Sequence, residues 1–195
     1  MDFAEPVTLT GRRVVLEPLT AAHADAMEAA AADGDLSRLW YTSVPAPGSM
    51  AADIERRLGL QRAGSMLPFA VIRPQTARAV GMTTCMNIDA GHRRVEIGST
   101  WYAKSVQRTG LNTEAKLLLL GHAFETLQCI AVEFRTHWMN QQSRAAIARL
   151  GAKQDGVLRN HQIAPDGSYR DTVSFSIIES EWPAVKRHLH HLLER

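Results

Sequence analysis

Residues 101–115 read Trp-Tyr-Ala-Lys-Ser-Val-Gln-Arg-Thr-Gly-Leu-Asn-Thr-Glu-Ala. This stretch begins as a β-like run, passes through a loop centred on Gly110 and enters the start of a helix. The first turn of a helix leaves backbone N–H groups unpaired and carries the positive end of the helix dipole. The stretch therefore predicts a strand, a turn and a helix start that together hold an anion such as phosphate.

The residues upstream of this stretch favour strands in the middle and helices near the beginning. A short β-run over 9–19 leads to Thr20, which would cap a helix over about 21–32, and Ser49 would cap a second helix. Three β-runs separated by turn residues follow: 68–73, 79–88 and 94–103. Because the turns between them are short, we expect adjacent antiparallel strands.

Downstream, helical and β-like segments alternate. Apolar residues recur at helical spacing over 112–127: Leu120, Ala123, Phe124 and Leu127. A strand over 129–136, a helix over 140–150 and a hairpin of 157–162 with 168–178 around Ala-Pro-Asp-Gly are then expected. A last helix over about 181–195 carries an apolar face that would pack on the domain or meet a partner chain: Trp182, Val185, Leu189 and Leu192.

Composition points to one soluble domain over residues 1–195. The 22 Lys and Arg exceed the 20 Asp and Glu by two, without a block of one sign, which argues against a nucleic-acid or membrane surface. Cys85 and Cys129 lie in apolar runs and read as reduced core thiols. The first residues do not form a secretory signal, and no apolar run approaches the ~20 residues that span a bilayer. We expect a cytoplasmic protein.

Residues Gln107 to Asn112 resemble motif A of the GCN5-related N-acetyltransferases, in which Gln or Arg is followed by two residues, Gly, one residue, and Gly or Ala. Asn112 departs from the small last residue, although Asn tolerates left-handed backbone and caps helices well. Residues 140–152 resemble the family's Asn-x-x-Ser helix ending in Leu-Gly, and a Glu96-Ile-Gly98 strand precedes motif A. The resemblance covers about residues 8–178 and is closest to the branch of ribosomal-protein N-terminal acetyltransferases (RimJ/RimL-like).

This resemblance implies an α/β fold, with a central mixed, mostly antiparallel sheet flanked by helices. It also implies acetyl-CoA as cosubstrate and no metal. The cofactor-binding residues would then be Trp101, Tyr102, Ala103, Gln107, Arg108, Thr109, Gly110, Leu111, Asn112, Thr113, Asn140 and Ser143. The alternatives are an ordinary strand-to-helix turn for the loop and a core aromatic for Trp101.

Acetyl transfer to an amine needs a donor for the developing oxyanion, a base for the ammonium and an acid for the leaving thiolate. A β-bulge on the 95–103 strand would expose a backbone N–H for the first task. Ser143 is the candidate acid, and Asn140 would orient the pantetheine arm or a water, or only cap its helix. Glu96 is the candidate base, or binds the ammonium, or is a solvated or salt-bridged residue without a catalytic role. An exposed amine could use water as its base instead.

The leading hypothesis is an N-acetyltransferase that moves the acetyl group of acetyl-CoA to a primary amine, either a protein N-terminus or a small molecule, directly within a ternary complex. The alternative is a non-catalytic acyl-CoA-binding module that signals to a protein partner. A homodimer is compatible with both. The cluster of His188, His190 and His191 lacks Cys or carboxylate companions, so we expect surface histidines and not a metal site.

Overall fold

The structure is a computed structural model that describes residues 2–42, 44–164 and 166–195. Its centre is an eight-stranded sheet in the order β1-β2-β3-β4-β5-β6-β8-β7. The strands are β1 (Leu9–Thr10), β2 (Val15–Pro18), β3 (Met66–Arg73), β4 (Arg78–Asp89), β5 (Arg94–Tyr102), β6 (Ala131–His137), β7 (Lys153–Ile163) and β8 (Tyr169–Ile178). Every neighbouring pair is antiparallel except β5–β6, which is parallel. The predicted mixed, mostly antiparallel sheet is therefore confirmed.

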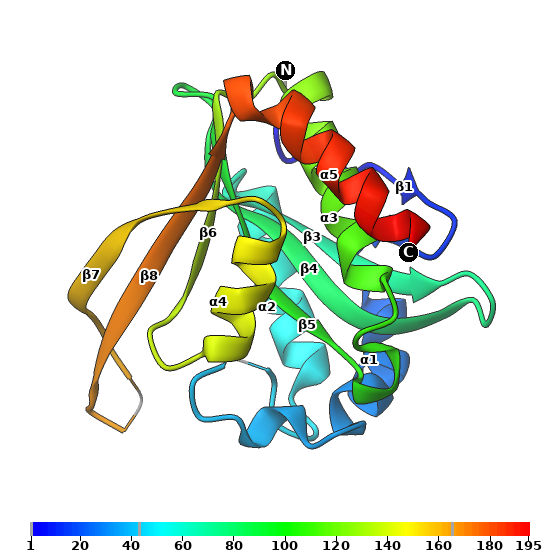
Figure 1. Cartoon of the computed structure of the whole chain (residues 1–195). Helices are drawn as coiled ribbons and strands as arrows, with labels where there is room; N and C mark the ends of the chain where they lie inside the picture. The colour runs from blue at the N-terminus through cyan, green and yellow to red at the C-terminus, as the bar shows by residue number, and fades with distance from the viewer. Residues whose placement is uncertain (1, 43, 165) are drawn as a thin grey trace.

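Helices cover both faces of the sheet (Figure 1). They are α1 (Ala24–Ala32), α2 (Met50–Arg62), α3 (Leu111–Gly121), α4 (Gln141–Arg149) and α5 (Trp182–Glu194), with short 3₁₀ turns at Ala21–His23, Leu36–Arg38, Lys104–Val106 and Glu179–Glu181. Arg57 of α2 reaches Thr84, whereas Lys116 of α3 reaches Thr83. Because consecutive strand residues point to opposite faces, α2 and α3 lie on opposite sides of the sheet.

The helix predicted over 112–127 is not regular throughout. After Gly121 the chain continues as a π-helical turn, His122–Thr126, in which the N–H of Leu127 bonds to the carbonyl of His122 at 2.9 Å. The wider turn adds one residue per hydrogen-bonded ring. Gln128 then adopts a φ of 54°, which ends the helix before β6. The predicted apolar stripe of this segment is buried all the same.

The apolar face of α5 is covered within the chain. Trp182, Val185 and Leu189 are buried, and α5 packs along α3, as Figure 1 shows. The rings of Trp182 and Phe124 stack with centroids 5.4 Å apart. Of the two alternatives for this helix, packing on the domain is the one observed.

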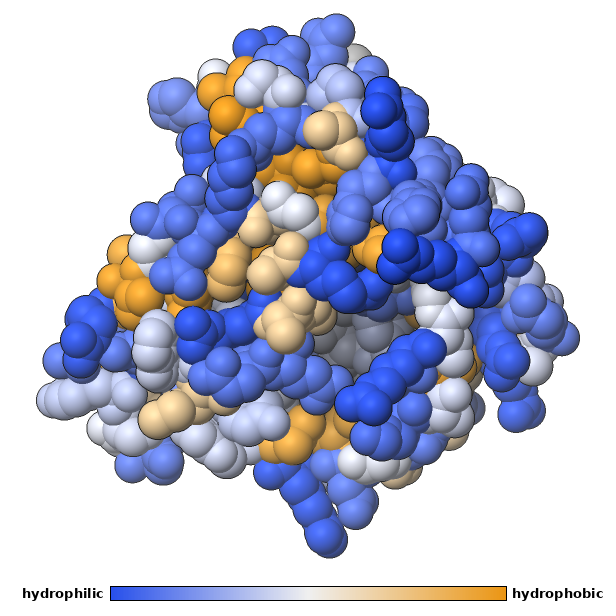
Figure 2. All heavy atoms as spheres, viewed as in Figure 1, coloured by the Kyte–Doolittle hydropathy of each residue, from blue (hydrophilic) through white to orange (hydrophobic). Residues whose placement is uncertain are grey.

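The predicted hairpin is formed by β7 and β8, and Pro165 of its turn lies outside the described residues. On the face shown in Figure 2, hydrophilic residues cover most of the surface, and apolar residues are visible in separate groups. No helix in the described ranges is long and apolar enough to cross a membrane.

The parallel pair β5–β6 opens soon after it begins. The two strands pair only over residues 94–96 and 131–133, and β5 then continues to Tyr102 paired with β4 alone. Figure 1 shows the two strands close at one end and apart at the other. Residues 97–102 of β5 therefore present an unpaired backbone edge within the sheet, among the residues described.

Candidate active site

The turn before α3 carries a run of unused backbone donors. Among the described residues, no acceptor receives a hydrogen bond from the N–H groups of residues 108–113. Arg108 and Gly110 have positive φ values of 62° and 82°, so the backbone curls before the helix begins at Leu111. Successive N–H groups in such a curl converge on one region, where the positive end of the helix dipole adds to them. The predicted anion cradle has the donors it needs.

The side chains of this turn shape it. The Gln107 side chain donates to the carbonyl of Tyr102 at 3.0 Å, and the Thr109 hydroxyl donates to the carbonyl of Val106 at 2.7 Å. The Tyr102 hydroxyl donates to the Asn112 side chain at 2.9 Å. Asn112, the departure from motif A, thus anchors the turn to β5. Leu111 is buried in the core.

Two arginines distant in sequence flank the cradle. Arg13, in the turn between β1 and β2, has its side-chain carbons and Nε within 4 Å of the position that a Cβ would take on Gly110. Its Nε is buried without an acceptor, and its Nη2 donates to the carbonyl of Leu193 at 3.0 Å. Arg149, at the end of α4, donates to the Thr113 hydroxyl at 2.8 Å. Convergent N–H groups and two guanidinium groups are the donor set that suits a diphosphate.

Sequence reasoning did not find Arg13 or Arg149. Both reach the cradle through tertiary contacts, across about 100 residues for Arg13 and 36 for Arg149. The backbone N–H groups of Arg12 and Arg13 donate to the buried carboxylate of Glu114 in the first turn of α3. No local pattern around Arg13 signals this placement.

The free part of β5 contains a bulge. Thr84 pairs with Gly98 and Met82 with Trp101, so Thr83 alone opposes both Ser99 and Thr100. Ser99 has a φ of 48°. A bulge of this kind takes a residue out of the ladder and re-aims its backbone groups. The structure therefore has the irregularity that an exposed N–H on this strand requires.

Trp101, Tyr102 and Ala103, which are predicted to bind the cofactor, differ in which of their hydrogen-bonding groups are already used within the chain. Trp101 is buried in the core, as its alternative interpretation held, and its Nε1 has no acceptor in the described ranges. The N–H of Ala103 donates to Val80 at 2.8 Å and its carbonyl accepts from Val106, so both backbone groups of Ala103 are used within the chain. The carbonyl of Tyr102 accepts from the Gln107 side chain.

A buried lysine supports the bulge from the α3 side. The Nζ of Lys116 donates to the hydroxyls of Thr83 and Thr100 at 2.9 and 2.8 Å, and these two hydroxyls are themselves 2.8 Å apart. Lys116 is only 5% exposed. Burial lowers its pKa from 10.5 to about 7, because the charged ammonium loses its hydration.

Helix α4 begins at the predicted Asn140. Its side-chain oxygen accepts the N–H of Ser143 at 3.0 Å, so the capping role proposed for Asn140 is present. Ser143 is half-buried, and its hydroxyl has no hydrogen-bond partner in the part of the chain that the structure describes. The other end of α4 reaches the cradle through Arg149 and Thr113. Helix α4 therefore links the end of β6 to the start of α3.

Glu96 lies where β5 and β6 separate. It is only 6% exposed, so it is not a solvated residue, and its carboxylate accepts from the Asn87 side chain at 2.8 Å. The Arg135 Nε is 3.6 Å from the same oxygen. Burial raises the pKa of Glu96, against the opposing effects of Asn87 and Arg135. A carboxyl with a raised pKa is a stronger base than a solvated one.

One histidine of the last helix, His188, contacts the backbone of α4. The His188 Nε2 lies 2.9 Å from the carbonyl of Arg149. Across residues 2–42, 44–164 and 166–195, no group of three His, Cys, Asp or Glu side chains is placed to hold a metal ion.

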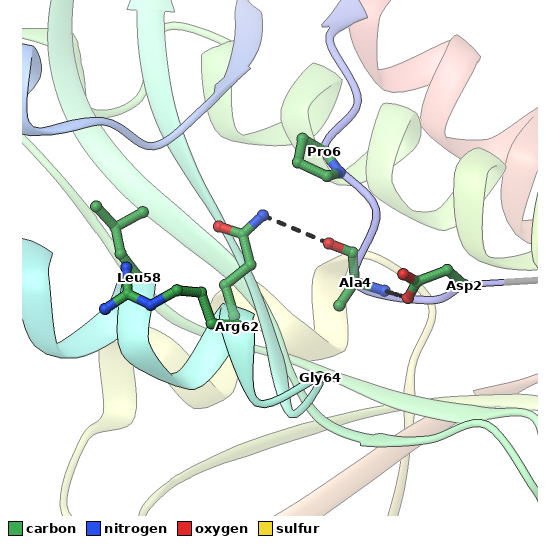
Figure 3. A pocket seen from close by; sticks show the side chains of 7 residues that line it. Asp2, Ala4, Pro6, Leu58, Arg62 and Gly64 are labelled. Carbon is green, nitrogen blue, oxygen red and sulfur yellow. Dashed lines mark hydrogen bonds between the residues drawn. The ribbon is translucent and has the colours of Figure 1, made fainter.

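One hollow in the described surface lies away from these residues. It has a volume of about 390 Å³ and is lined by Asp2, Ala4, Pro6, Leu58, Gln61, Arg62 and Gly64. Figure 3 shows Arg62 and Leu58 on one side of it and the N-terminal segment on the other. None of the predicted site residues lines it, and it is not the candidate site.

Comparison with known proteins places the chain among acetyltransferases. The family described as acetyltransferase (GNAT) domain matches residues 13–153. The Bacillus subtilis protein named "Putative ribosomal N-acetyltransferase YdaF" is 33% identical over 106 residues, which is 54% of this chain and 57% of that protein's length. The chain thus matches little more than half of that relative.

Two solved structures are similar over almost the whole chain. A GCN5-related N-acetyltransferase from Brucella melitensis is 32% identical, with a TM-score of 0.83 over 96% of this chain and 85% of the other. Mycobacterium smegmatis RimJ, solved in complex with CoA-disulfide, is 25% identical, with a TM-score of 0.83 over 98% of this chain and 97% of the other.

Proposed function

Since this chain belongs to the acetyltransferase (GNAT) family, we propose that it transfers the acetyl group of acetyl-CoA to a primary amine, at a protein N-terminus or on a small molecule. One observation carries the proposal: the unused N–H groups of residues 108–113 lie at the start of α3, next to the open edge of β5. The CoA complex of RimJ supports the choice of cofactor, and the Bacillus subtilis relative, named as a putative ribosomal N-acetyltransferase, supports a protein as acceptor.

The cradle and β5 would hold the cofactor. The N–H groups of residues 108–113, with Arg13 and Arg149 beside them, would bind the diphosphate, and the open edge of β5 would orient the pantetheine arm. When bound, acetyl-CoA supplies a thioester whose acyl carbon accepts the amine and whose thiolate leaves. A backbone N–H at the Ser99–Thr100 bulge would stabilise the negative charge that develops on the acyl oxygen.

Two side chains would manage the protons of a direct transfer within a ternary complex. Glu96, directly or through a water, would accept the proton that the ammonium must lose before its nitrogen can form the new C–N bond. Ser143 would donate a proton to the sulfur as the C–S bond breaks. A thiol with a pKa near 8.5 needs modest help to leave, so Ser143 has the lighter task.

Calorimetry with acetyl-CoA tests the cradle. Gly110→Glu places a carboxylate and a strained φ at the centre of the donors, so binding should weaken at least a hundredfold. The control is Gly167→Glu, because Gly167 has a similar φ of 83° with no atom within 4 Å. Wild-type affinity weaker than millimolar, or equal affinity for the wild type and Gly110→Glu, would overturn the proposal.

Mass spectrometry with a panel of N-terminal peptides and small amines tests the transfer. Acetylation of peptide N-termini would identify a protein acceptor, and acetylation of small amines a metabolic one. Tight acetyl-CoA binding without transfer to any acceptor would instead favour a non-catalytic acyl-CoA-binding module.

A further inference from the structure

Arg170 of β8 is a half-buried arginine that forms no ion pair with any residue that the structure describes. Its Nε is buried without a hydrogen-bond acceptor. Its guanidinium forms no ion pair and no side-chain hydrogen bond with the residues described. A buried donor without an acceptor is costly, and such groups are rare in folded proteins. A half-buried guanidinium without a partner among the described residues is suited to bind an anionic ligand.

The sheet register places Arg170 on the face that carries Glu96. Glu96 is the partner of Glu133 in the parallel pair, and His137 pairs with Thr172, two residues from Arg170. Side chains two residues apart on a strand share a face, and so do paired residues on neighbouring strands. Glu96, Glu133, Arg135, His137 and Arg170 therefore lie on one face, and the charges of Glu96 and Arg170 act on each other.

The charges on this face do not balance. Arg94 and Arg135 both form ion pairs with Glu133, and Arg135 also lies near Glu96. Arg170 is the third arginine on this face. The face therefore carries three guanidinium groups and two carboxylates, those of Glu96 and Glu133. Because Glu96 must accept a proton during transfer, its carboxylate cannot remain a permanent partner for Arg170. One additional negative charge, supplied by a ligand, would balance the charges on this face.

An aromatic side chain borders the same face. The Trp40 ring packs edge-on against His137 with centroids 5.0 Å apart, yet Trp40 is 68% exposed. Arg170 also lies close enough to His137 to lower its pKa, in addition to the effect of burial. The groups available to an acceptor on this side of the sheet are thus a carboxylate base, an unpaired guanidinium and an exposed indole.

We infer that Arg170 binds a carboxylate of the acceptor, so that the preferred acceptors are primary amines that carry a carboxylate near the amine. The inference rests on the proposed acetyl transfer and names its substrate class. Two kinds of molecule share this chemistry: a peptide with an acidic residue close to its N-terminus, and a free amino-acid-like metabolite. A guanidinium binds a carboxylate through parallel charge-assisted hydrogen bonds, which a neutral amide cannot match.

The experiment compares acceptors that differ only in one carboxylate. The peptide arm uses two peptides that are identical except for glutamate or glutamine at the second position. The metabolite arm uses alanine and alaninamide, which differ only in the carboxylate next to the amine. We expect kcat/KM to favour the carboxylate member of one pair by about tenfold or more in the wild type, and the arm that shows the preference identifies the source.

Variants assign the preference to Arg170. Arg170→Met should reduce the carboxylate-to-amide ratio of kcat/KM to about one, and Arg170→Glu should invert it. The control is Arg159→Met on the same hairpin, since Arg159 is exposed and already paired with Asp171. This variant should retain the wild-type ratio.

The outcomes separate this inference from the proposed function. Acetylation without a carboxylate preference in either arm, or a preference that survives in Arg170→Met, would overturn the inference and leave acetyl transfer intact. A uniform loss of rate in Arg170→Met at an unchanged ratio would also overturn it, because it would assign Arg170 a role toward Glu96 alone. Absence of transfer to every acceptor would instead contradict the proposed function.

Discussion

The Nζ of Lys116 on α3 lies 2.8 Å from the Oγ1 of Thr100 on β5, inside the core of the domain. Thr100 belongs to the bulge, and Thr83 on the opposite strand receives a second hydrogen bond from the same amine. A single side chain thus fastens both sides of an irregular strand pair. The arrangement puts a group that is expensive to bury directly behind the strand that borders the proposed reaction centre.

Lys116→Met should lower activity without lowering stability. Methionine is close to lysine in length and removes the desolvated amine, so the free energy of unfolding should stay the same or rise. The variant loses the two hydrogen bonds from Lys116 to Thr83 and Thr100 that hold the bulge. We therefore expect kcat to fall about tenfold, while the KM for acetyl-CoA stays within twofold. Urea unfolding and steady-state kinetics measure the two effects. Leu119→Met, at another buried position of α3, should leave kcat unchanged.

A falling stability with unchanged kcat would contradict this role for Lys116. Lys116→Arg offers a further check, because arginine keeps the donors but not the compact shape of the amine. A partial recovery of kcat relative to Lys116→Met is expected.

The buried amine of Lys116 destabilises the folded protein by an amount that should depend on pH. Its pKa is about 7 in the folded protein and near 10.5 when solvated, so above pH 7 the unfolded chain binds more protons than the folded chain. Wild-type stability should therefore rise relative to Lys116→Met between pH 7 and 9, by about 2 kcal/mol. Urea unfolding of both proteins at three pH values measures the difference. A difference that stays constant over this range would show that the amine is solvated.

Glu96→Gln should remove the acid limb of the pH–rate profile. Burial raises the pKa of Glu96 above its usual 4.5, so kcat/KM of the wild type should fall as pH decreases through that raised value. The variant should be about a hundredfold slower at neutral pH, because a base contributes on this scale. Asp89→Asn is a matched control, since Asp89 is an exposed carboxylate on the neighbouring strand. An unchanged rate in Glu96→Gln would leave water as the base.

Ser143→Ala should lower turnover more than cofactor affinity. The hydroxyl is half-buried and unbonded in the described structure, so its removal leaves the Asn140 cap in place. We expect kcat to fall about tenfold and the Kd for acetyl-CoA to change less than threefold. Ser168→Ala in the β7–β8 turn serves as the control. Equal kcat in a folded Ser143→Ala protein would remove the acid role.

Most of the fold could be predicted because its signals are local. The helix start after Gly110, the strands over 68–73 and 79–88 and the helix over 140–150 each follow from residues within a few positions of one another. The π-helical turn at 122–126 was not predictable in this way, because the apolar spacing of the segment is that of an ordinary α-helix.

The same distinction between local signals and tertiary contacts applies to the candidate site. The cradle could be found from Gly110 and its neighbours, since a turn and a helix start bring their own donors. Arg13, Arg149 and Arg170 could not, because each reaches its place through strand order and packing that no local pattern encodes. The burial of Glu96 was equally hidden, because a Glu between two apolar strand residues, Val95 and Ile97, is expected on the exposed face of a strand.

The curl at residues 108–113 offers its backbone amides, whereas the acceptor face around Arg170 offers side chains. Every residue except proline has a backbone N–H, but a guanidinium is lost with a single substitution. Outside the positive-φ position Gly110, binding of the cosubstrate should therefore depend less on side-chain identity than the choice of acceptor does. A protein engineer could redirect this scaffold to new amines by substituting a few residues on β6 and β8 while leaving the anion cradle at residues 108–113 unchanged.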